Sequence, residues 1–443
     1  MPVSPARAAA FDILLRVEQR DAFASELLHS ERLDKLTVPD RALTTELVMG
    51  VLRWRSRLDQ SIAENCSRPL AKLDPEVLLA LRIAAYQLLF LSRIPARAAI
   101  HESVDLVKRA RKSSAAPFAN AVLRKLAHME PLPPRDNAAL SAAQLAADFA
   151  HPAWLVERWV SQYGIEAASA ICRHDQRVPA TSIRIENDDV AHELKAVGVT
   201  LAPGALLNAA RVVTGGDVTQ TRAYRESRVF IQDEASQLVA LLVGRGSRLL
   251  DCCAAPGGKT AVLAARNPTA EIVAAEIHPH RAELLRRRIR AENVRVIAAD
   301  ARHLPLRGEF DRVLADVPCS GTGTLARNPE IKWRLKPEDM PALHAKQVAI
   351  LEAALQQLAP GGRAVYSTCS LEPEENEAVV AEVLRADMPF ALFDCRSELE
   401  TLRAAGHLRL NDVGELLSGP YLRTLPAIHP CDGFFAAILE RQT

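Results

Sequence analysis

Residues 247–260 read Ser-Arg-Leu-Leu-Asp-Cys-Cys-Ala-Ala-Pro-Gly-Gly-Lys-Thr: a short apolar strand, a turn of small residues and the start of a helix. Amphipathic helical patterns alternate with short apolar segments farther along the chain, and the additional strand candidates are 271–275, 294–298, 312–315 and 363–366. This alternation is typical of a parallel, doubly wound sheet with helices on both faces. We therefore predict an α/β domain over residues 231–443.

The preceding half of the chain predicts two further domains. Apolar residues recur at helical spacing from near the start, which indicates an all-α helical bundle over residues 1–135. The segment Pro131-Leu-Pro-Pro-Arg-Asp-Asn137, rich in helix breakers, marks its end. Residues 140–230 combine a helix near 154–163 with a strand at 181–185, which favours a small α+β domain.

The composition favours a globular, cytoplasmic protein. Of the 443 residues, 49% are hydrophobic, which is enough for several separately cored domains. The eight cysteines include no Cys-x-x-Cys pair, so we expect reduced thiols, no disulfide scaffold and no metal site. We expect no signal peptide, no membrane contact and a monomer. Because the formal net charge is only +1, a nucleic-acid partner must be inferred from local patches.

Three acidic residues, Glu276, Asp300 and Asp316, follow successive predicted strands. Ligands of open α/β sheets bind beyond the carboxyl ends of the strands. Each acid alone could cap a helix or lie in a solvated loop. Three together suit a nucleoside cofactor with a ribose diol, an amino group and a positive charge, as in S-adenosylmethionine. NAD is the competing cofactor, yet residues 251–260 match neither a dinucleotide fingerprint nor a phosphate loop.

Two cysteines, Cys319 and Cys369, each lie just past a predicted buried strand, beside glycine or serine turns. We expect the two thiols to meet over one pocket. Cytosine C5 is a poor nucleophile, so its methylation needs a thiolate that adds at C6 and a base that later removes the C5 proton. Two thiols beside a methyl donor suit this reaction, and the residues alone leave open which thiol attacks.

The other cysteines considered have structural interpretations. Free cysteine is commonly a small core residue, and we expect this of Cys66, Cys172 and Cys395. Cys252 and Cys253 are expected to shape the cofactor loop rather than to react.

Several motifs of the carboxyl-terminal half occur together in one enzyme family. They lie at Phe230–Gln237, Asp251–Thr260, Leu314–Gly323, Arg327–Trp333, Gly361–Ser370, Glu374–Asn376 and Asp432–Phe435. In these segments the chain resembles the RNA cytosine-5 methyltransferases of the Nol1/Nop2/Sun (Fmu) family, for which joint Pro-Cys and Thr-Cys motifs are highly specific. The resemblance implies a Rossmann-like, S-adenosylmethionine-dependent methyltransferase domain.

The resemblance also implies roles for individual residues. Cys369 would be the nucleophile and Cys319 would assist release of the product, while Asp316 and Lys259 would lie near the target base. The implied cofactor contacts are Cys253, Ala254, Ala255, Pro256, Gly257, Gly258, Lys259, Glu276, Asp300 and Asp316. Glu276 stands where the family commonly has Asp, which affects only the geometry at the ribose.

The amino-terminal segment Asp40–Trp54 resembles the NusB-type RNA-binding bundle. Fused to such a methyltransferase, the bundle implies 16S rRNA as the substrate. The alternatives are the same chemistry on tRNA, or an RNA-binding assembly or antitermination factor. Positive charge between Arg97 and Lys125 is a candidate phosphate footprint, or else a solvated helix face. Lys332-Trp333-Arg334 is a candidate base-stacking loop, with simple packing of Trp333 as the alternative.

Overall fold

The computed structural model describes residues 3–20, 22–30, 33, 35–130, 141–185, 187–385 and 389–442. They form two compact units, and each is described by itself. The first unit spans Met1–Val178 together with the decapeptide Leu325–Arg334, and the second spans Pro179–Thr324 together with Leu335–Thr443. The domain boundary predicted at Pro131–Asn137 lies outside the described residues.

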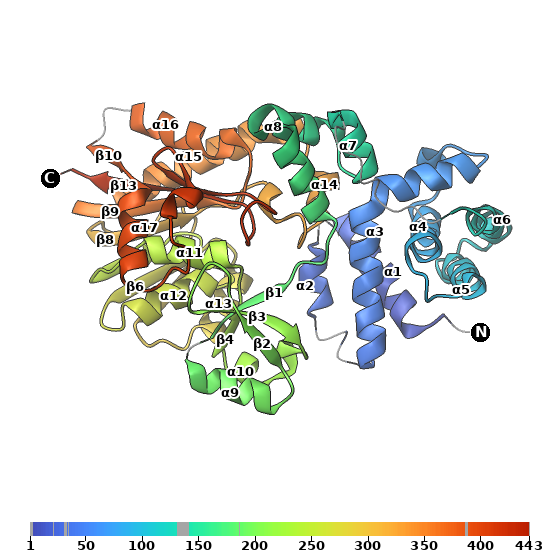
Figure 1. Ribbon diagram of the computed structural model, residues 1–443, viewed down its shortest axis with the longest axis horizontal. Coiled ribbons are helices and arrows are strands. Elements are labelled where there is room, and N and C mark those ends of the chain that lie inside the picture. Colours follow the sequence, from blue (N-terminus) through green and yellow to red (C-terminus); the bar gives the residue numbers. More distant parts are fainter. Residues whose placement is uncertain are drawn as a thin grey trace. The chain divides into compact units, whose positions relative to one another are not determined.

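The first unit is helical, as predicted (Figure 1). Its helices are α1 (Pro5–Arg20), α2 (Ala24–Leu28), α3 (Val38–Asn65), α4 (Pro75–Phe90), α5 (Ala96–Arg109), α6 (Ala116–Leu126), α7 (Ala142–Asp148), α8 (Ala153–Asp175) and α14 (Ile331–Arg334). The Thr37 side chain caps the long helix α3 by accepting a hydrogen bond from the Asp40 N–H. Apolar residues at helical spacing, such as Phe11, Leu79 and Ile83, are buried in one shared core.

The helix predicted near 154–163 is the first part of α8. It stops at Gly164, whose φ of 81° and ψ of 164° lie outside the helical region. Glycine adopts this positive φ without the steric cost that a Cβ brings. A second helical stretch then continues to Asp175.

The second unit begins with a small antiparallel sheet of order β2-β3-β1-β4. Its elements are β1 (Thr181–Ile185), α9 (Asp188–Ala196), β2 (Thr200–Pro203), β3 (Ala210–Gly215), α10 (Arg222–Arg225) and β4 (Val229–Ile231). Ile183, Val190, Leu194 and Val229 form its core between sheet and helices. The predicted strand at 181–185 and the small α+β arrangement are confirmed.

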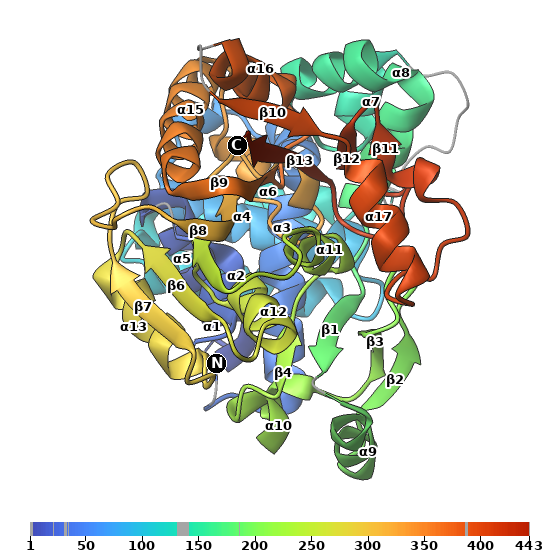
Figure 2. The ribbon, with the colours of Figure 1, turned by 90° about the vertical axis from the view of Figure 1, so that its left-hand side faces the viewer.

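A second, larger sheet carries the rest of this unit (Figure 2). Its strands are β5 (Arg248–Asp251), β6 (Glu271–Glu276), β7 (Val294–Ala298), β8 (Phe310–Asp316), β9 (Leu358–Thr368), β10 (Phe390–Phe393), β11 (Leu417–Ser418), β12 (Tyr421–Thr424) and β13 (Phe434–Arg441). Its helices are α11 (Glu234–Leu242), α12 (Gly258–Arg266), α13 (Pro279–Arg288), α15 (Met340–Gln356), α16 (Glu377–Arg385) and α17 (Cys395–Ala404). The strand order is β11-β12-β13-β9-β8-β5-β6-β7, with β10 paired to β13.

Helices cover both faces of this sheet, as the doubly wound prediction requires. Leu249 of β5 joins a core with Leu238 of α11 and Leu263 of α12. Its neighbour Leu250 joins a different core with Leu351 of α15. Successive side chains of a strand point to opposite faces, so both β5 residues are buried and the strand is a continuous apolar run.

The sheet is mixed, which corrects the expectation of a purely parallel one. Strands β5 to β9 pair in parallel, whereas β13 pairs antiparallel with β9, β10 and β12. The strands after residue 389 were not predicted. The run Phe434–Leu439 is buried throughout, so it has no alternation between apolar and polar residues, and periodicity alone does not distinguish it from a buried helix.

Candidate active site

Parallel pairing brings the carboxyl ends of β5, β6, β8 and β9 to one edge of the large sheet. Asp251 ends β5, Glu276 ends β6 and Asp316 ends β8. Cys369 directly follows Thr368, the last residue of β9. Asp300 lies two residues beyond the end of β7. The predicted site residues therefore come from neighbouring strand ends.

The two thiols meet at this edge. The Cys319 and Cys369 Sγ atoms lie 3.4 Å apart, within hydrogen-bond reach of each other, and both side chains are half-buried. The Gly323 N–H also donates to the Cys369 carbonyl at 2.9 Å, which ties the loop after β8 to the loop after β9. The pair can therefore act on one bound group.

The two sulfurs have different electrostatic surroundings. The hydrogen bond with Cys369, followed by burial and the charges of Cys369 and Glu375, holds the pKa of Cys319 well above its ordinary value. Cys319 therefore keeps its proton and can donate it toward the Cys369 sulfur. One neutral thiol beside a second sulfur suits a division of labour between nucleophile and helper.

A lysine–aspartate pair lies beside the thiols in the fold. Lys259 Nζ lies 2.7 Å from Asp316 Oδ2, and the Ser367 hydroxyl donates to Asp316 Oδ1 at 2.7 Å. Burial opposes the charged form of Lys259, yet the charge of Asp316 and its hydrogen bond outweigh it and raise the lysine pKa. The charge of Cys369 also contributes to that rise, so Lys259 and a Cys369 thiolate attract each other. Lys259 therefore keeps its charge, and the pair can orient a polar ligand.

The turn after β5 closes tightly against its surroundings. Gly257 has a φ of 107°, and a Cβ there would lie 2.8 Å from the Leu285 side chain. Gly258 begins helix α12, and a Cβ there would lie 3.1 Å from the Gln232 side chain. Both glycines therefore allow close packing of the turn against these side chains, at the amino end of α12.

Sequence reasoning did not include Asp251 among the site residues. Its side chain is buried, and Thr260 Oγ1 donates to its Oδ2 at 2.7 Å. Among the described residues, its Oδ1 has no hydrogen-bond partner. Burial raises the pKa of Asp251 to about 7. An acid that ends an apolar strand just before a glycine turn is the signal that could have identified it.

The two remaining acids differ in how far other groups of the protein already occupy their carboxylates. Glu276 is buried, and its Oε1 accepts a hydrogen bond from the backbone N–H of His278 at 2.9 Å. Asp300 is held by the Arg302 guanidinium, with a shortest contact of 2.6 Å, and this hydrogen bond lowers the pKa of Asp300 to about 2. Glu276 thus has the freer carboxylate, whereas Asp300 already has a cationic partner.

The remaining cysteine predictions concern structural roles. Cys172 and Cys395 are fully buried, as predicted. Cys66 is half-buried and packs against the core of the first unit, and its thiol lies 3.0 Å from the Arg68 carbonyl at the end of α3. Cys252 and Cys253 lie in the turn after β5, where burial raises the pKa of both thiols. Protonated thiols in that turn fit a structural role.

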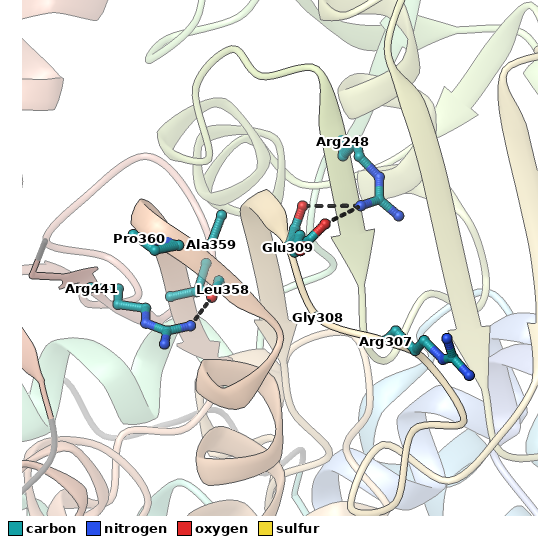
Figure 3. Close-up of a pocket in the computed structure, with 8 residues that line it drawn as sticks. All are labelled: Arg248, Arg307, Gly308, Glu309, Leu358, Ala359, Pro360 and Arg441. Atoms are coloured by element: carbon teal, nitrogen blue, oxygen red, sulfur yellow. Dashed lines mark hydrogen bonds and ion pairs between the residues drawn. The ribbon is translucent and has the colours of Figure 1, made fainter.

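A cavity of about 480 Å³ opens at the opposite edge of the large sheet (Figure 3). Arg248 begins β5 and Leu358 begins β9, so the cavity lies at the amino ends of the strands. Three of its charged groups are engaged with the protein: Arg248 contacts Glu309, and Arg441 donates to the Leu358 carbonyl. This cavity is separate from the thiol pair.

Lys332 is an anchor of the first unit rather than an RNA contact. Its ammonium group is buried and donates to the carbonyls of Arg53 at 3.0 Å and Ala150 at 2.9 Å. Burial lowers the pKa of Lys332 to about 7. The expectation of an exposed cation at this position is therefore wrong.

The neighbours of Lys332 are anchored in the same way. The Trp333 indole N–H donates to the Leu52 carbonyl at 2.6 Å, and Arg334 donates to the carbonyls of Val17 and Ala22 at 2.7 and 2.6 Å. The segment forms helix α14 and not an open loop. Packing, which was the alternative interpretation, accounts for the three side chains.

The buried lysine predicts a pH-dependent stability that a Lys332→Met variant lacks. The folded-state pKa is near 7 and the unfolded value near 10.5, so between these values the unfolded chain binds a proton that the folded chain does not. Stability therefore rises with pH in this window, by up to about 1.4 kcal/mol per pH unit. From pH 7 to 9 in urea melts, the wild type is expected to gain about 2 kcal/mol over the variant.

Lys125→Met provides the matched control, because Lys125 is exposed on α6 of the same unit. Its urea melts should follow those of the wild type at every pH. Parallel pH profiles for the wild type and Lys332→Met would contradict the assignment of a buried, titrating ammonium.

The predicted phosphate footprint between Arg97 and Lys125 is partly neutralised. Lys108 pairs with Asp105 at 2.9 Å, Arg109 with Asp12 at 2.8 Å, and Lys112 with Asp74 at 3.2 Å. Other basic side chains of this stretch, Arg97, Arg111, Arg124 and Lys125, are exposed. Both a solvated face and an RNA contact fit these positions, and the RNA contact stays a prediction.

Among the described residues there is neither a candidate membrane span nor a candidate metal cluster. None of the helices there combines the length and apolar character needed to cross a membrane. In the same residues, no group of three or more His, Cys, Asp or Glu side chains is arranged to hold a metal ion.

Three family models match consecutive parts of the chain. The NusB family matches residues 4–128, the ferredoxin-like domain of RsmF/B-like methyltransferases matches 151–219, and the 16S rRNA methyltransferase RsmB/F family matches 239–440. The probable ribosomal RNA small subunit methyltransferase B of Bacillus subtilis (strain 168) is 33% identical over 395 residues, which is 86% of this chain and 88% of that protein. The chain belongs to the RsmB/F family of 16S rRNA methyltransferases. The resemblance inferred from the sequence, including its NusB-like part, is confirmed.

Other matches include a curated relative and two solved structures. The ribosomal RNA small subunit methyltransferase B of Vibrio cholerae (serotype O1, El Tor Inaba N16961) is 31% identical over 452 residues, 98% of this chain and 97% of that protein. The crystal structure of PH0851 has 26% identity and a TM-score of 0.81, and the match covers 99% of both chains. A methyltransferase homolog from Pyrococcus horikoshii has 25% identity and a TM-score of 0.56 over 69% of this chain and 100% of that one. The match to PH0851 therefore extends over the parts of this chain that the three family models match.

Proposed function

We propose that this RsmB/F-family protein transfers a methyl group from S-adenosylmethionine to C5 of a cytosine in 16S rRNA, through a covalent bond between Cys369 and C6. The observation that carries the proposal is the pair of sulfurs 3.4 Å apart at the ends of neighbouring strands. Of the two, Cys319 is kept protonated by its surroundings. Cytosine C5 methylation is a reaction that needs one attacking thiolate and one helper.

The chemistry proceeds in two stages. The Cys369 thiolate adds to C6, which forms a carbon–sulfur bond and moves an electron pair onto C5. S-adenosylmethionine supplies an electrophilic methyl group, which C5 takes up. A base then removes the C5 proton, the C5–C6 double bond re-forms, and the Cys369 sulfur departs as a thiolate.

The environment of Cys319 suits the base of the second stage. The hydrogen bond with Cys369 is the leading cause of its raised pKa. Once the Cys369 sulfur is bonded to C6, it carries no charge, so the Cys369 charge no longer raises the pKa of Cys319, although burial and the charge of Glu375 still do. Formation of the adduct thus makes the Cys319 thiol easier to ionise, and it can release its proton to solvent and take the C5 proton instead.

The residues at the strand ends fit S-adenosylmethionine. Glu276 offers a freer carboxylate for the ribose diol than Asp300 does, because Arg302 already holds Asp300. The buried Oδ1 of Asp251, which has no partner among the described residues, is a free acceptor for a cationic amino group. The other proposed contacts are those of the turn after β5: Cys253, Ala254, Ala255, Pro256, Gly257 and Gly258. Lys259 and Asp316 are proposed to orient the target base.

Two observations support RNA as the substrate. The NusB family match places an RNA-binding type of bundle in the first unit, and exposed basic residues lie on α5 and α6 of that unit. The curated relatives in Bacillus subtilis and Vibrio cholerae are named as methyltransferases of small subunit ribosomal RNA. The target cytosine must leave its base stack to reach Cys369, which favours a single-stranded or looped segment.

The purified protein should place 5-methylcytosine in 16S rRNA in vitro. The measurement is bisulfite sequencing of unmodified 16S rRNA and tRNA after incubation with S-adenosylmethionine, with a parallel titration of the cofactor by calorimetry. One protected cytosine in 16S rRNA is expected. Protection of a cytosine in tRNA alone would show that the substrate is tRNA and not 16S rRNA. Absence of both cofactor binding and methylation would favour an assembly or antitermination factor.

A further inference from the structure

A single buried carboxylate joins the two cysteine loops. Glu375 ends the 3-10 turn Pro373–Glu375 and has no exposed surface. Its Oε1 accepts hydrogen bonds from the Ser320 N–H at 2.8 Å and from Gln347 Nε2 at 2.8 Å. Its Oε2 accepts from the hydroxyls of Ser320 and Ser370. Four donors therefore converge on one side chain.

These donors belong to the segments that carry the thiols. Ser320 directly follows Cys319, and Ser370 directly follows Cys369. Gln347 of α15 donates to the Pro318 carbonyl at 3.1 Å as well as to Glu375, so the Pro-Cys loop is held on both sides of its cysteine. The carboxylate thus bridges two loops that are about fifty residues apart in the chain.

Packing alone does not account for a carboxylate here. Removing a charge from water is costly unless hydrogen bonds or an opposite charge compensate it. Among the ion pairs of the described residues, none involves Glu375, so its four neutral donors must compensate the burial. An apolar side chain would leave the Ser320 N–H without its acceptor and would leave the Ser320 and Ser370 hydroxyls, which lie 3.0 Å apart, to bond each other. Glu375 is therefore one of the groups that fix the relative position of the loops, together with the hydrogen bond from the Gly323 N–H to the Cys369 carbonyl.

We propose that Glu375 is a positioning residue that sets the distance between the Cys319 and Cys369 thiols. Its importance for methyl transfer rests on the proposed function, but its control of the thiol distance does not. With the two sulfurs 3.4 Å apart, the nucleophile and the helper can act on the same base. A small displacement of one cysteine loop would place one of the sulfurs out of reach of that base. The charge of Glu375 also contributes to the raised pKa of Cys319, after the hydrogen bond with Cys369, burial and the Cys369 charge.

The test measures how readily the two thiols form a disulfide, without RNA or S-adenosylmethionine. Diamide takes two electrons and two protons from a pair of nearby thiols, which leaves one sulfur–sulfur bond and reduced diamide. The rate of the Cys319–Cys369 crosslink can be followed by peptide mass spectrometry. Glu375→Gln keeps the shape of the side chain but replaces one carboxylate oxygen, which accepts hydrogen bonds, with an amide NH₂ group, which donates them. We expect the crosslink to form about tenfold more slowly in this variant.

Glu338→Gln is the matched control, because Glu338 is an exposed glutamate in another 3-10 turn of the same unit, Pro337–Asp339. It should crosslink at the wild-type rate. In methyl transfer, Glu375→Gln should lower kcat about tenfold or more while the KM values for RNA and S-adenosylmethionine stay near the wild type. Crosslinking of Glu375→Gln at the wild-type rate or faster would overturn the proposal, whatever the methylation assay shows.

Ser370→Ala covers the case in which Glu375→Gln does not fold. It deletes one hydroxyl donor and leaves the carboxylate in place. A slowed crosslink in this variant supports the bridge, and an unchanged crosslink overturns it. Slowed crosslinking together with absent cytosine methylation would leave the positioning role intact and reject the proposed reaction instead.

Discussion

Replacement of Cys369 by alanine is expected to abolish methyl transfer, with a loss of kcat of about 10⁴-fold or more. The variant lacks the sulfur that adds to C6, so C5 never gains the electron density that it needs to attack a methyl group. The fold and the cofactor turn after β5 should be unaffected, because Cys369 follows the last residue of β9. The measurement is transfer of labelled methyl groups to 16S rRNA, with calorimetry to show that S-adenosylmethionine still binds.

Cys66→Ala is the matched control for this loss. Cys66 is a half-buried thiol of the first unit at the end of α3, and its removal should leave methyl transfer at the wild-type level. Substantial methyl transfer by Cys369→Ala would reject Cys369 as the nucleophile. If Cys369→Ala transferred methyl groups and Cys319→Ala were completely inactive, Cys319 would be the nucleophile and Cys369 the helper.

Replacement of Cys319 by alanine is expected to have a different effect: the variant forms the covalent adduct with RNA but does not release the product. Methyl transfer to C5 proceeds once, and without the Cys319 thiol the C5 proton is removed slowly, so the Cys369–C6 bond persists. The adduct is measured as a slowly migrating, nuclease-sensitive band on a denaturing gel. Multiple-turnover kcat should fall by a factor of about 10² to 10⁴.

The double variant Cys319→Ala/Cys369→Ala controls for nonspecific crosslinking. It should show no adduct, because the attacking sulfur is absent. If Cys319→Ala released its product as fast as the wild type, with no trapped band, Cys319 would have no part in release, and its raised pKa would need another explanation.

Much of the catalytic unit could be predicted from local patterns. The strand candidates at 271–275, 294–298, 312–315 and 363–366 correspond to β6, β7, β8 and β9, because short apolar runs bounded by turn residues are buried strands of a parallel sheet. The positions of the acids and thiols could be predicted in the same way, because ligands bind where such strands end. Their proximity is therefore a consequence of topology.

Other features escaped sequence reasoning for physical reasons. The strand Phe434–Arg441 lacks an alternating pattern because its first part is buried on both faces. The sequence predicts that Lys332 is a solvated or RNA-binding cation, yet in the fold its ammonium group donates to two backbone carbonyls. Burial of a polar side chain depends on which distant groups can satisfy it, and that is not a local property.

The sequence by itself determined the alternation of strands β5 to β9 with helices, the place of Cys319 and Cys369 at strand ends and the helical character of the first unit. Only the tertiary structure decided that the two sulfurs lie 3.4 Å apart and that Glu375 bridges their loops. It also decided that Lys332 is anchored by the carbonyl of Arg53, 279 residues earlier in the chain. Periodicity reports which face of an element is buried, whereas hydrogen bonds between distant segments depend on how those faces pack together.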